Sequence, residues 1–276
     1  MHDAAVGHQC PECAHEVRSS VRSTRTAFGG TLAGQHGHVT KTLIGVNVAV
    51  AVLAMVIGGA RAVAGGGLGG LLGGSTSLHI WGGMVVGFPG ATDGVVNGDY
   101  YRMITSMFLH YGVFHLLLNM WALWVVGGVL EPLLGRARFL ALYLISGIGG
   151  SVAVYLTAGV DLVMFNRQLF GGLDTPTAGA SGAVFGLFGA FYVFMRRMGR
   201  DTSMITMILV INIIFTFTVP AISVAGHLGG LGTGLLVALA LAYAPRRHRT
   251  RVQAITVSAV AVLLVVLTLA RTAALT

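Results

Sequence analysis

Apolar residues are gathered into seven stretches of this chain, and none of these stretches contains Asp, Glu, Lys or Arg. Each is close to the about 20 residues that a helix needs to cross a bilayer. They cover residues 42–60, 111–130, 139–160, 175–195, the two halves of 202–244 on either side of Pro220, and 252–270. The pattern predicts an all-α, polytopic helical membrane protein with seven spans. A cleaved signal peptide is not expected, because polar sequence precedes the first span.

The polar connections divide the chain into three parts. Residues 1–40 form an N-terminal segment, residues 41–244 a core of six spans, and residues 245–276 a basic linker with the seventh span. The connection over 61–110 is long, and its apolar middle, LHIWGGMVVGFPG, is expected to lie in the membrane interface or to re-enter the membrane. No internal repeat is visible in the sequence, which argues against a transporter built from two inverted halves.

Composition and charge narrow the class of partner. Hydrophobic residues make up 55% of the chain and charged residues 9%, with a net charge of +8, which is unlike a soluble domain. With the N-terminus in the cytosol, thirteen Arg and Lys residues fall on the inner side and four on the outer side, as the positive-inside rule requires. The positive charge therefore reflects orientation in an anionic lipid bilayer, and we expect no nucleic acid partner.

Four polar side chains interrupt the spans at a similar depth. His115 and Asn119 lie in the second span, Ser181 in the fourth and His227 in the sixth. These spans all run inward from the outer side, and the rise of a helix puts the four residues roughly 6–12 Å below the outer surface. Polar groups on three helices that are not neighbours in sequence are therefore predicted to share one layer.

Two explanations fit this layer. The polar residues could form hydrogen bonds between helices, and glycines such as Gly179 and Gly182 could serve close packing alone. In the chemical alternative, the glycines let the fourth and sixth spans approach until Ser181 and His227 share a hydrogen bond. Ionisable residues inside a membrane are functional candidates by default, which favours the chemical alternative.

The same residues form a set that is suited to acyl transfer. His227 could take the proton of the Ser181 hydroxyl near neutral pH. Asn119 and His115 are the candidate donors to a developing oxyanion. No acidic residue lies in the spans, and the nearest one, Asp174, falls outside them. We therefore predict a Ser-His dyad and not a triad.

The motifs around these residues resemble those of the rhomboid family of intramembrane serine proteases, from about residue 100 to 243. GASG at 179–182 matches the G-x-S-G of that family, and His115 to Asn119 matches its H-x-x-x-N. AGHLGG at 225–230 has one glycine more before the histidine than the A-H-x-x-G of the family. Tyr101-Arg102 stands where the family has Trp-Arg, and Phe185 matches an aromatic position that commonly packs on the catalytic histidine.

The resemblance implies a rhomboid-like six-helix core plus a C-terminal seventh span. Ser181 would be the nucleophile and His227 the base, with Gly179, Gly182 and Phe185 in support. The substrates would be single-span transmembrane proteins, cut near the outer leaflet of the cell membrane, and catalysis would need no cofactor. Alternatives from other classes are a catalytically silent client-binding protein and a polytopic transporter.

A separate pattern, HQCPECAH, lies near the N-terminus. Cys10 and Cys13 form a C-x-x-C flanked by His8 and His15, and all four are residue types that bind zinc. A disulfide is not expected in a cytosolic segment. Structural zinc sites generally join two such halves, and this stretch resembles the second half of a cysteine-rich ribbon that precedes some bacterial rhomboids. The resemblance implies a partial zinc ribbon whose first half is missing, and we expect little zinc to be bound by this chain.

Overall fold

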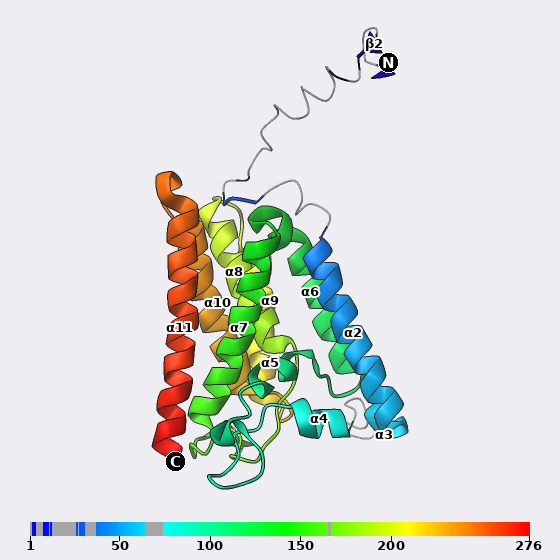
Figure 1. The fold of residues 1–276 in the computed structure, drawn as a ribbon, viewed down its shortest axis with the longest axis vertical. Helices are drawn as coiled ribbons and strands as arrows, with labels where there is room; N and C mark the ends of the chain where they lie inside the picture. The colour runs from blue at the N-terminus through cyan, green and yellow to red at the C-terminus, as the bar shows by residue number, and fades with distance from the viewer. Residues whose placement is uncertain are drawn as a thin grey trace.

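Long helices lie side by side in an upright bundle, and most of the shorter elements gather toward one end of it (Figure 1). The computed structural model describes residues 2–3, 8–10, 12, 26, 28–30, 37–63, 74–164 and 167–276. The bundle helices are α2 (His38–Gly58), α6 (Gly112–Leu134), α7 (Arg136–Thr157), α8 (Ser181–Arg197), α9 (Ser203–Thr218), α10 (Val224–Tyr243) and α11 (Arg249–Leu275). The predicted helical class is confirmed.

The remaining elements are short. The long first connection contains α3 (Ala60–Val63), α4 (Ser77–Gly82), η2 (Val95–Asn97), α5 (Arg102–Thr105) and η3 (Ser106–Phe108), and η4 (Arg246–His248) precedes α11. Two antiparallel pairs of two-residue strands join β1 (His2–Asp3) to β2 (His8–Gln9) and β3 (Val163–Met164) to β4 (Arg167–Gln168). The apolar middle of the first connection, which the sequence places at the membrane interface, thus supplies α4 near one end of the bundle (Figure 1).

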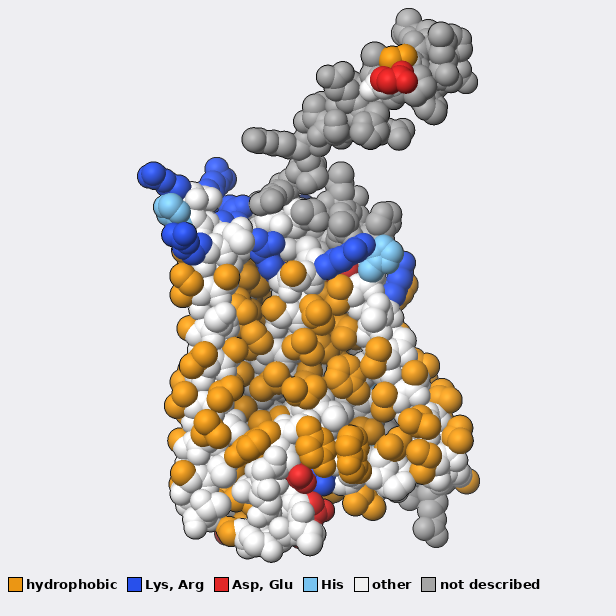
Figure 2. All heavy atoms as spheres, in the orientation of Figure 1, with side chains coloured by type: hydrophobic (Ala, Val, Ile, Leu, Met, Phe, Trp, Pro, Cys, Tyr) orange, Lys and Arg blue, Asp and Glu red, His pale blue; other side chains and the backbone are white. Residues whose placement is uncertain are grey.

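The described part of the chain has five helices that are long and apolar enough to cross a membrane. They are α2, α6, α7, α10 and the segment Arg246–Leu275 that contains α11. Helices α8 and α9 have 17 and 16 residues and are shorter than the predicted spans. Figure 2 shows apolar side chains over the flank of the bundle and most Lys and Arg at one end. So large an exposed apolar surface requires lipid around it, and the protein is a multi-pass membrane protein.

Glycines bring α8 and α10 into direct backbone contact. A Cβ atom on Gly230 of α10 would overlap with the carbonyl oxygen of Gly182 in α8. One turn further along, a Cβ on Gly234 would overlap with the backbone of Gly186. Small residues at such positions allow helices in a membrane to approach closely. The predicted close approach of the fourth and sixth spans is confirmed.

Helices α8 and α10 begin later than the hydrophobic pattern predicts. The pattern starts the fourth span at residue 175, whereas α8 begins at Ser181. Met84 and Thr177 exchange two backbone hydrogen bonds of 2.8 and 2.9 Å, and this pairing with the first connection keeps the chain before Ser181 out of the helix. Helix α10 begins only at Val224, after the N-cap Ser223. The start of α8 is therefore set by a contact with a distant segment, and the start of α10 by its own N-cap, which accepts from the Gly226 N–H.

A buried carboxylate holds the start of α2 against α6. Glu131 near the end of α6 is fully buried. It accepts hydrogen bonds from the N–H groups of Val39 and Thr40, at 2.9 and 2.8 Å, and from the Thr40 hydroxyl at 2.7 Å. A carboxylate here satisfies the free N–H groups of the first turn and faces the positive end of the helix dipole. Glu131 thereby fixes one edge of the bundle.

Candidate active site

Ser181 is the first residue of α8, and a glycine turn delivers it there. Gly179 has a φ of 134°, and its N–H donates to the carbonyl oxygen of Ser106 at 2.9 Å. A side chain at Gly179 would be strained in this conformation and would collide with His115. The hydroxyl of Ser181 therefore lies at the N-terminus of a helix, where backbone N–H groups are free and the dipole favours negative charge.

His227 lies in the first turn of α10, and contacts on two sides fix its ring. The ring of Phe185 stacks on the imidazole with a centroid distance of 4.0 Å and an interplanar angle of 25°. Nδ1 of His227 is 2.8 Å from the hydroxyl oxygen of Thr216 in α9. His227 is only 8% exposed, so the imidazole is held in place among buried neighbours. The expected packing of Phe185 on His227 is confirmed.

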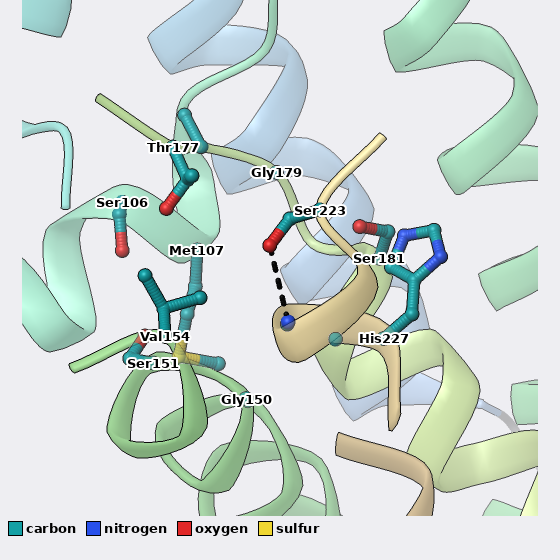
Figure 3. A pocket seen from close by; sticks show the side chains of 14 residues that line it. Ser106, Met107, Gly150, Ser151, Val154, Thr177, Gly179, Ser181, Ser223 and His227 are labelled. Atoms are coloured by element: carbon teal, nitrogen blue, oxygen red, sulfur yellow. Dashed lines mark hydrogen bonds between the residues drawn. The ribbon is translucent and has the colours of Figure 1, made fainter. Parts of the chain in front are cut away.

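Ser181 and His227 meet at one cavity of about 40 Å³. Figure 3 shows the Ser181 side chain beside the imidazole of His227, with the two side chains coming from different helices. The described residues show no hydrogen bond between the two side chains, so the predicted bond is not made in this structure. Catalytic hydrogen bonds are often long before substrate binds. The cavity exceeds the roughly 10–15 Å³ that one water needs, and Ser106 and Ser151 add polar groups to its lining.

His115 and Asn119, the predicted oxyanion donors, are placed differently. The point where a Cβ on Gly179 would stand lies 2.9 Å from Nε2 of His115 and 3.6 Å from Oγ of Ser181. His115 thus lies beside the candidate nucleophile. Asn119 is buried one turn further along α6, and its Nδ2 donates to the His115 carbonyl oxygen at 3.0 Å. His115 therefore lies against the glycine turn before Ser181, while one N–H of Asn119 is already bonded within α6.

The first connection is pinned by an arginine near the site. Arg102 is 3% exposed. Its Nη1 donates to the carbonyl oxygens of Ile80 and Gly83 at 2.7 and 3.2 Å, and its Nε donates to Asp99 at 2.8 Å. Burial would raise the pKa of Asp99, but hydrogen bonds from Arg102 and from the Gly94 N–H outweigh it and hold that pKa below its ordinary value. The carboxylate therefore stays charged and keeps Arg102 in place.

Further histidines next to the site were not predicted from the sequence. Nδ1 of His79 lies 2.8 Å from the Thr76 hydroxyl, and its Nε2 lies 3.1 Å from the carbonyl oxygen of His110. The rings of His110 and His115 make an edge contact with centroids 5.1 Å apart. His79 falls within the apolar middle of the first connection, where its isolation gave no signal. His79 thus ties α4 to the segment before α6, and His110 packs against His115.

The predicted zinc ligands lie mostly outside the described residues. Cys13 and His15 are not described, nor is the side chain of His8, while Cys10 is half-buried. Among the residues that the structure does describe, no group of three or more His, Cys, Asp or Glu could hold a metal ion. Zinc binding by this segment therefore stays a prediction.

Comparison with known proteins identifies the family. The rhomboid domain family profile matches residues 97–244. The rhomboid protease GluP of Bacillus subtilis (strain 168) is 38% identical over 155 residues, which is 53% of this chain but only 27% of GluP. YdcA of the same strain is 36% identical over 167 residues, 58% of this chain and 75% of YdcA. RHOMBOID-like protein 4 of Arabidopsis thaliana is 33% identical over 160 residues, 55% of this chain and 36% of that protein.

The protein is an integral membrane protein of bundled helices. A serine and a histidine at one cavity give it a candidate site for nucleophilic catalysis. Because the family profile covers more than half of its residues, the chain belongs to the rhomboid family. The matched region holds Ser181, His227, His115 and Asn119.

Proposed function

We propose that this protein is an intramembrane serine endopeptidase that cuts transmembrane segments of other membrane proteins with a Ser181–His227 dyad. The observation that carries the proposal is the meeting of these two side chains at one cavity in a rhomboid family member. GluP, with which the chain shares 38% identity, is named a rhomboid protease. We extend that activity to this chain on the strength of both observations.

The proposed reaction begins with attack by Oγ of Ser181 on the carbonyl carbon of a peptide bond. Nε2 of His227 takes the hydroxyl proton and passes it to the leaving amine as the C–N bond breaks, which leaves an ester on Ser181. Water then attacks the ester while His227 takes a proton from it, and His227 returns that proton to Oγ of Ser181 as the C–O bond breaks and a carboxylic acid leaves. No cofactor takes part in these steps.

Charge at the oxyanion has donors close by. The free N–H groups of the first turn of α8 and the ring of His115 lie next to Ser181. Donors that are held in place before the reaction stabilise the developing charge most effectively. Asn119, one turn of α6 from His115, is the remaining proposed donor. Gly179 and Gly182 support it by leaving room for His115 and for α10.

We further propose that the site opens toward the outer leaflet of the cell membrane, with the N-terminus in the cytosol. Arg and Lys gather at the end of the bundle opposite the C-terminus (Figures 1 and 2), which the positive-inside rule assigns to the cytosol. The substrates would be single-span proteins, since a lone helix can unwind into the site without breaking its own tertiary contacts. Zinc at the N-terminal C-x-x-C is a separate and independent proposal.

Purified protein in detergent, offered a transmembrane peptide substrate and a fluorophosphonate probe, tests the proposed function. Ser181→Ala removes one oxygen and leaves the glycine-lined packing intact, so the variant is expected to fold normally. Its cleavage rate should fall by on the order of 10⁶, to background, as for other serine nucleophiles. The probe should label the wild-type protein at Ser181 and leave Ser181→Ala unlabelled.

Ser203→Ala, at an exposed serine that starts α9, is the matched control and should keep full activity and labelling. Folded Ser181→Ala protein that still cut the substrate would end the protease proposal. If the wild-type protein binds the peptide but does not cleave it, the client-binding alternative is favoured. Uptake of a substrate by proteoliposomes that contain the protein would favour the transporter alternative.

A further inference from the structure

Thr216 in α9 makes a polar contact with Nδ1 of the His227 ring. Its side chain is fully buried, and its Oγ1 lies 2.8 Å from Nδ1 of His227. The same oxygen lies 2.7 Å from the backbone carbonyl oxygen of Asn212, one turn earlier in α9. The three groups form a short chain that runs from the backbone of α9 to the imidazole on α10.

The direction of these hydrogen bonds follows from what each group can donate. A carbonyl oxygen only accepts, and a threonine hydroxyl has a single hydrogen. That hydrogen must therefore go to the carbonyl of Asn212, since two oxygens 2.7 Å apart with no hydrogen between them would repel one another. The oxygen of Thr216 is then an acceptor toward His227, and Nδ1 must carry the proton that it accepts.

This direction decides which nitrogen of neutral His227 is basic. A neutral imidazole has one N–H and one lone pair. With the hydrogen on Nδ1, the lone pair is on Nε2, at the edge of the ring away from Thr216. Stacking on Phe185 at 4.0 Å holds the ring plane, and Figure 3 shows the Ser181 side chain beside this imidazole.

We propose that Thr216 is a positioning residue that fixes the tautomer of His227, so that Nε2 faces Ser181 as a free base. The proposal rests on the proposed protease function for its catalytic consequence. In Ser-His-Asp triads a buried carboxylate holds the histidine in the correct tautomer. Here the Thr216 hydroxyl, which is oriented by the Asn212 carbonyl, would hold the tautomer in place of a carboxylate. It does so without a charge inside the membrane, where a charge is costly.

Two variants and one control in α9 test the proposal. Thr216→Val keeps the shape and removes the hydroxyl, while Thr216→Ser keeps the hydroxyl. Thr218→Val is the matched control, because Thr218 donates to the carbonyl of Ile214 in the same manner, at 2.8 Å, but is exposed. We expect kcat of Thr216→Val to fall by ~10²-fold or more with KM unchanged, since a wrong tautomer costs up to about 10⁴ in a triad enzyme. Thr216→Ser and Thr218→Val should stay within a few-fold of wild type.

Nitrogen NMR of histidine-labelled protein reads the tautomer directly, with His227→Ala used to assign the signal. The wild-type protein and Thr216→Ser should show the Nδ1–H form at His227, and Thr216→Val a mixture of tautomers. An Nε2–H form in the wild-type protein, or a fully active Thr216→Val, would overturn the role of Thr216 while leaving the protease intact. Wild-type protein with the Nδ1–H form but without cleavage or probe labelling would instead refute the protease function. If Thr216→Val fails to fold, the wild-type NMR result still decides the tautomer.

Discussion

His115 and Asn119 share one face of α6 but relate to Ser181 in different ways. Nε2 of His115 lies against Gly179, beside the Ser181 hydroxyl. The side-chain amide of Asn119 donates one N–H to the backbone carbonyl oxygen of His115. Two residues that the sequence treats alike as oxyanion donors therefore differ in their contacts, and the consequence for turnover can be measured.

We expect His115→Ala to lower kcat by the ~10²–10³-fold that is typical of one oxyanion donor, and Asn119→Ala to lower it less. The physical reason is that one N–H of Asn119 is already bonded to the His115 carbonyl, whereas Nε2 of His115 lies against the turn before Ser181. Single-turnover cleavage of a transmembrane peptide, with thermal unfolding to confirm the fold, measures both effects. A larger loss for Asn119→Ala than for His115→Ala would contradict this ranking and make the amide the principal donor.

At the scale of elements, the site depends on the separation of α8 and α10. The first turn of each helix carries one member of the proposed dyad, and Gly182 with Gly230 sets the distance between the two backbones. Helix α9 acts from the other side of α10 through the contact of Thr216 with His227. The base is thus held between two helices, while the nucleophile is held by one helix and the first connection.

Gly230→Ala is expected to damage both stability and activity. Its Cβ would overlap with the carbonyl oxygen of Gly182, and overpacking of this kind costs about 1–3 kcal/mol. A shift of α10 of about 1 Å would also cost ~10²-fold in turnover. Gly232→Ala, where nothing lies within 4 Å of the added atom, is the control and should match or slightly exceed wild type in stability, since alanine favours the helix. Equal melting temperatures and rates for both variants would show that the close approach is not needed.

At the scale of the whole molecule, the seventh helix is tied to the core at both of its ends. Near its start, Gln253 of α11 accepts a hydrogen bond from Arg138 of α7 at 2.7 Å. Near its end, Thr272 lies 2.8 Å from the Tyr155 hydroxyl, and Arg271 donates to the carbonyl of Ala158 at 3.1 Å. Helix α11 is therefore a structural part of the bundle and runs along its apolar flank from one end to the other (Figures 1 and 2).

The charge distribution predicts the orientation of the bundle. Reporter fusions after residue 30, and within 136–138, 196–201 and 245–251, should report the cytosol, because Arg and Lys at short loops stay on that side. Fusions within 65–100 and 161–174 should report the outer side. A cytosolic report for 65–100 would place the start of α8, and with it Ser181, on the inner side of the membrane and refute the proposed site of cleavage.

The sequence by itself determined the helical membrane class and the family, and it singled out Ser181, His227, His115 and Asn119 as candidates. Apolar length and local motifs such as GASG are properties of a few consecutive residues, so no fold is needed to recognise them. Only the tertiary structure decided that α8 begins at Ser181, because the pairing of Thr177 with Met84 joins segments far apart in the chain. It also decided that Thr216 meets His227, since a threonine in an apolar helix gives no sign of what its hydroxyl will face. A hydrogen bond between helices depends on how they rotate and approach, and these are settled by the packing of the whole bundle.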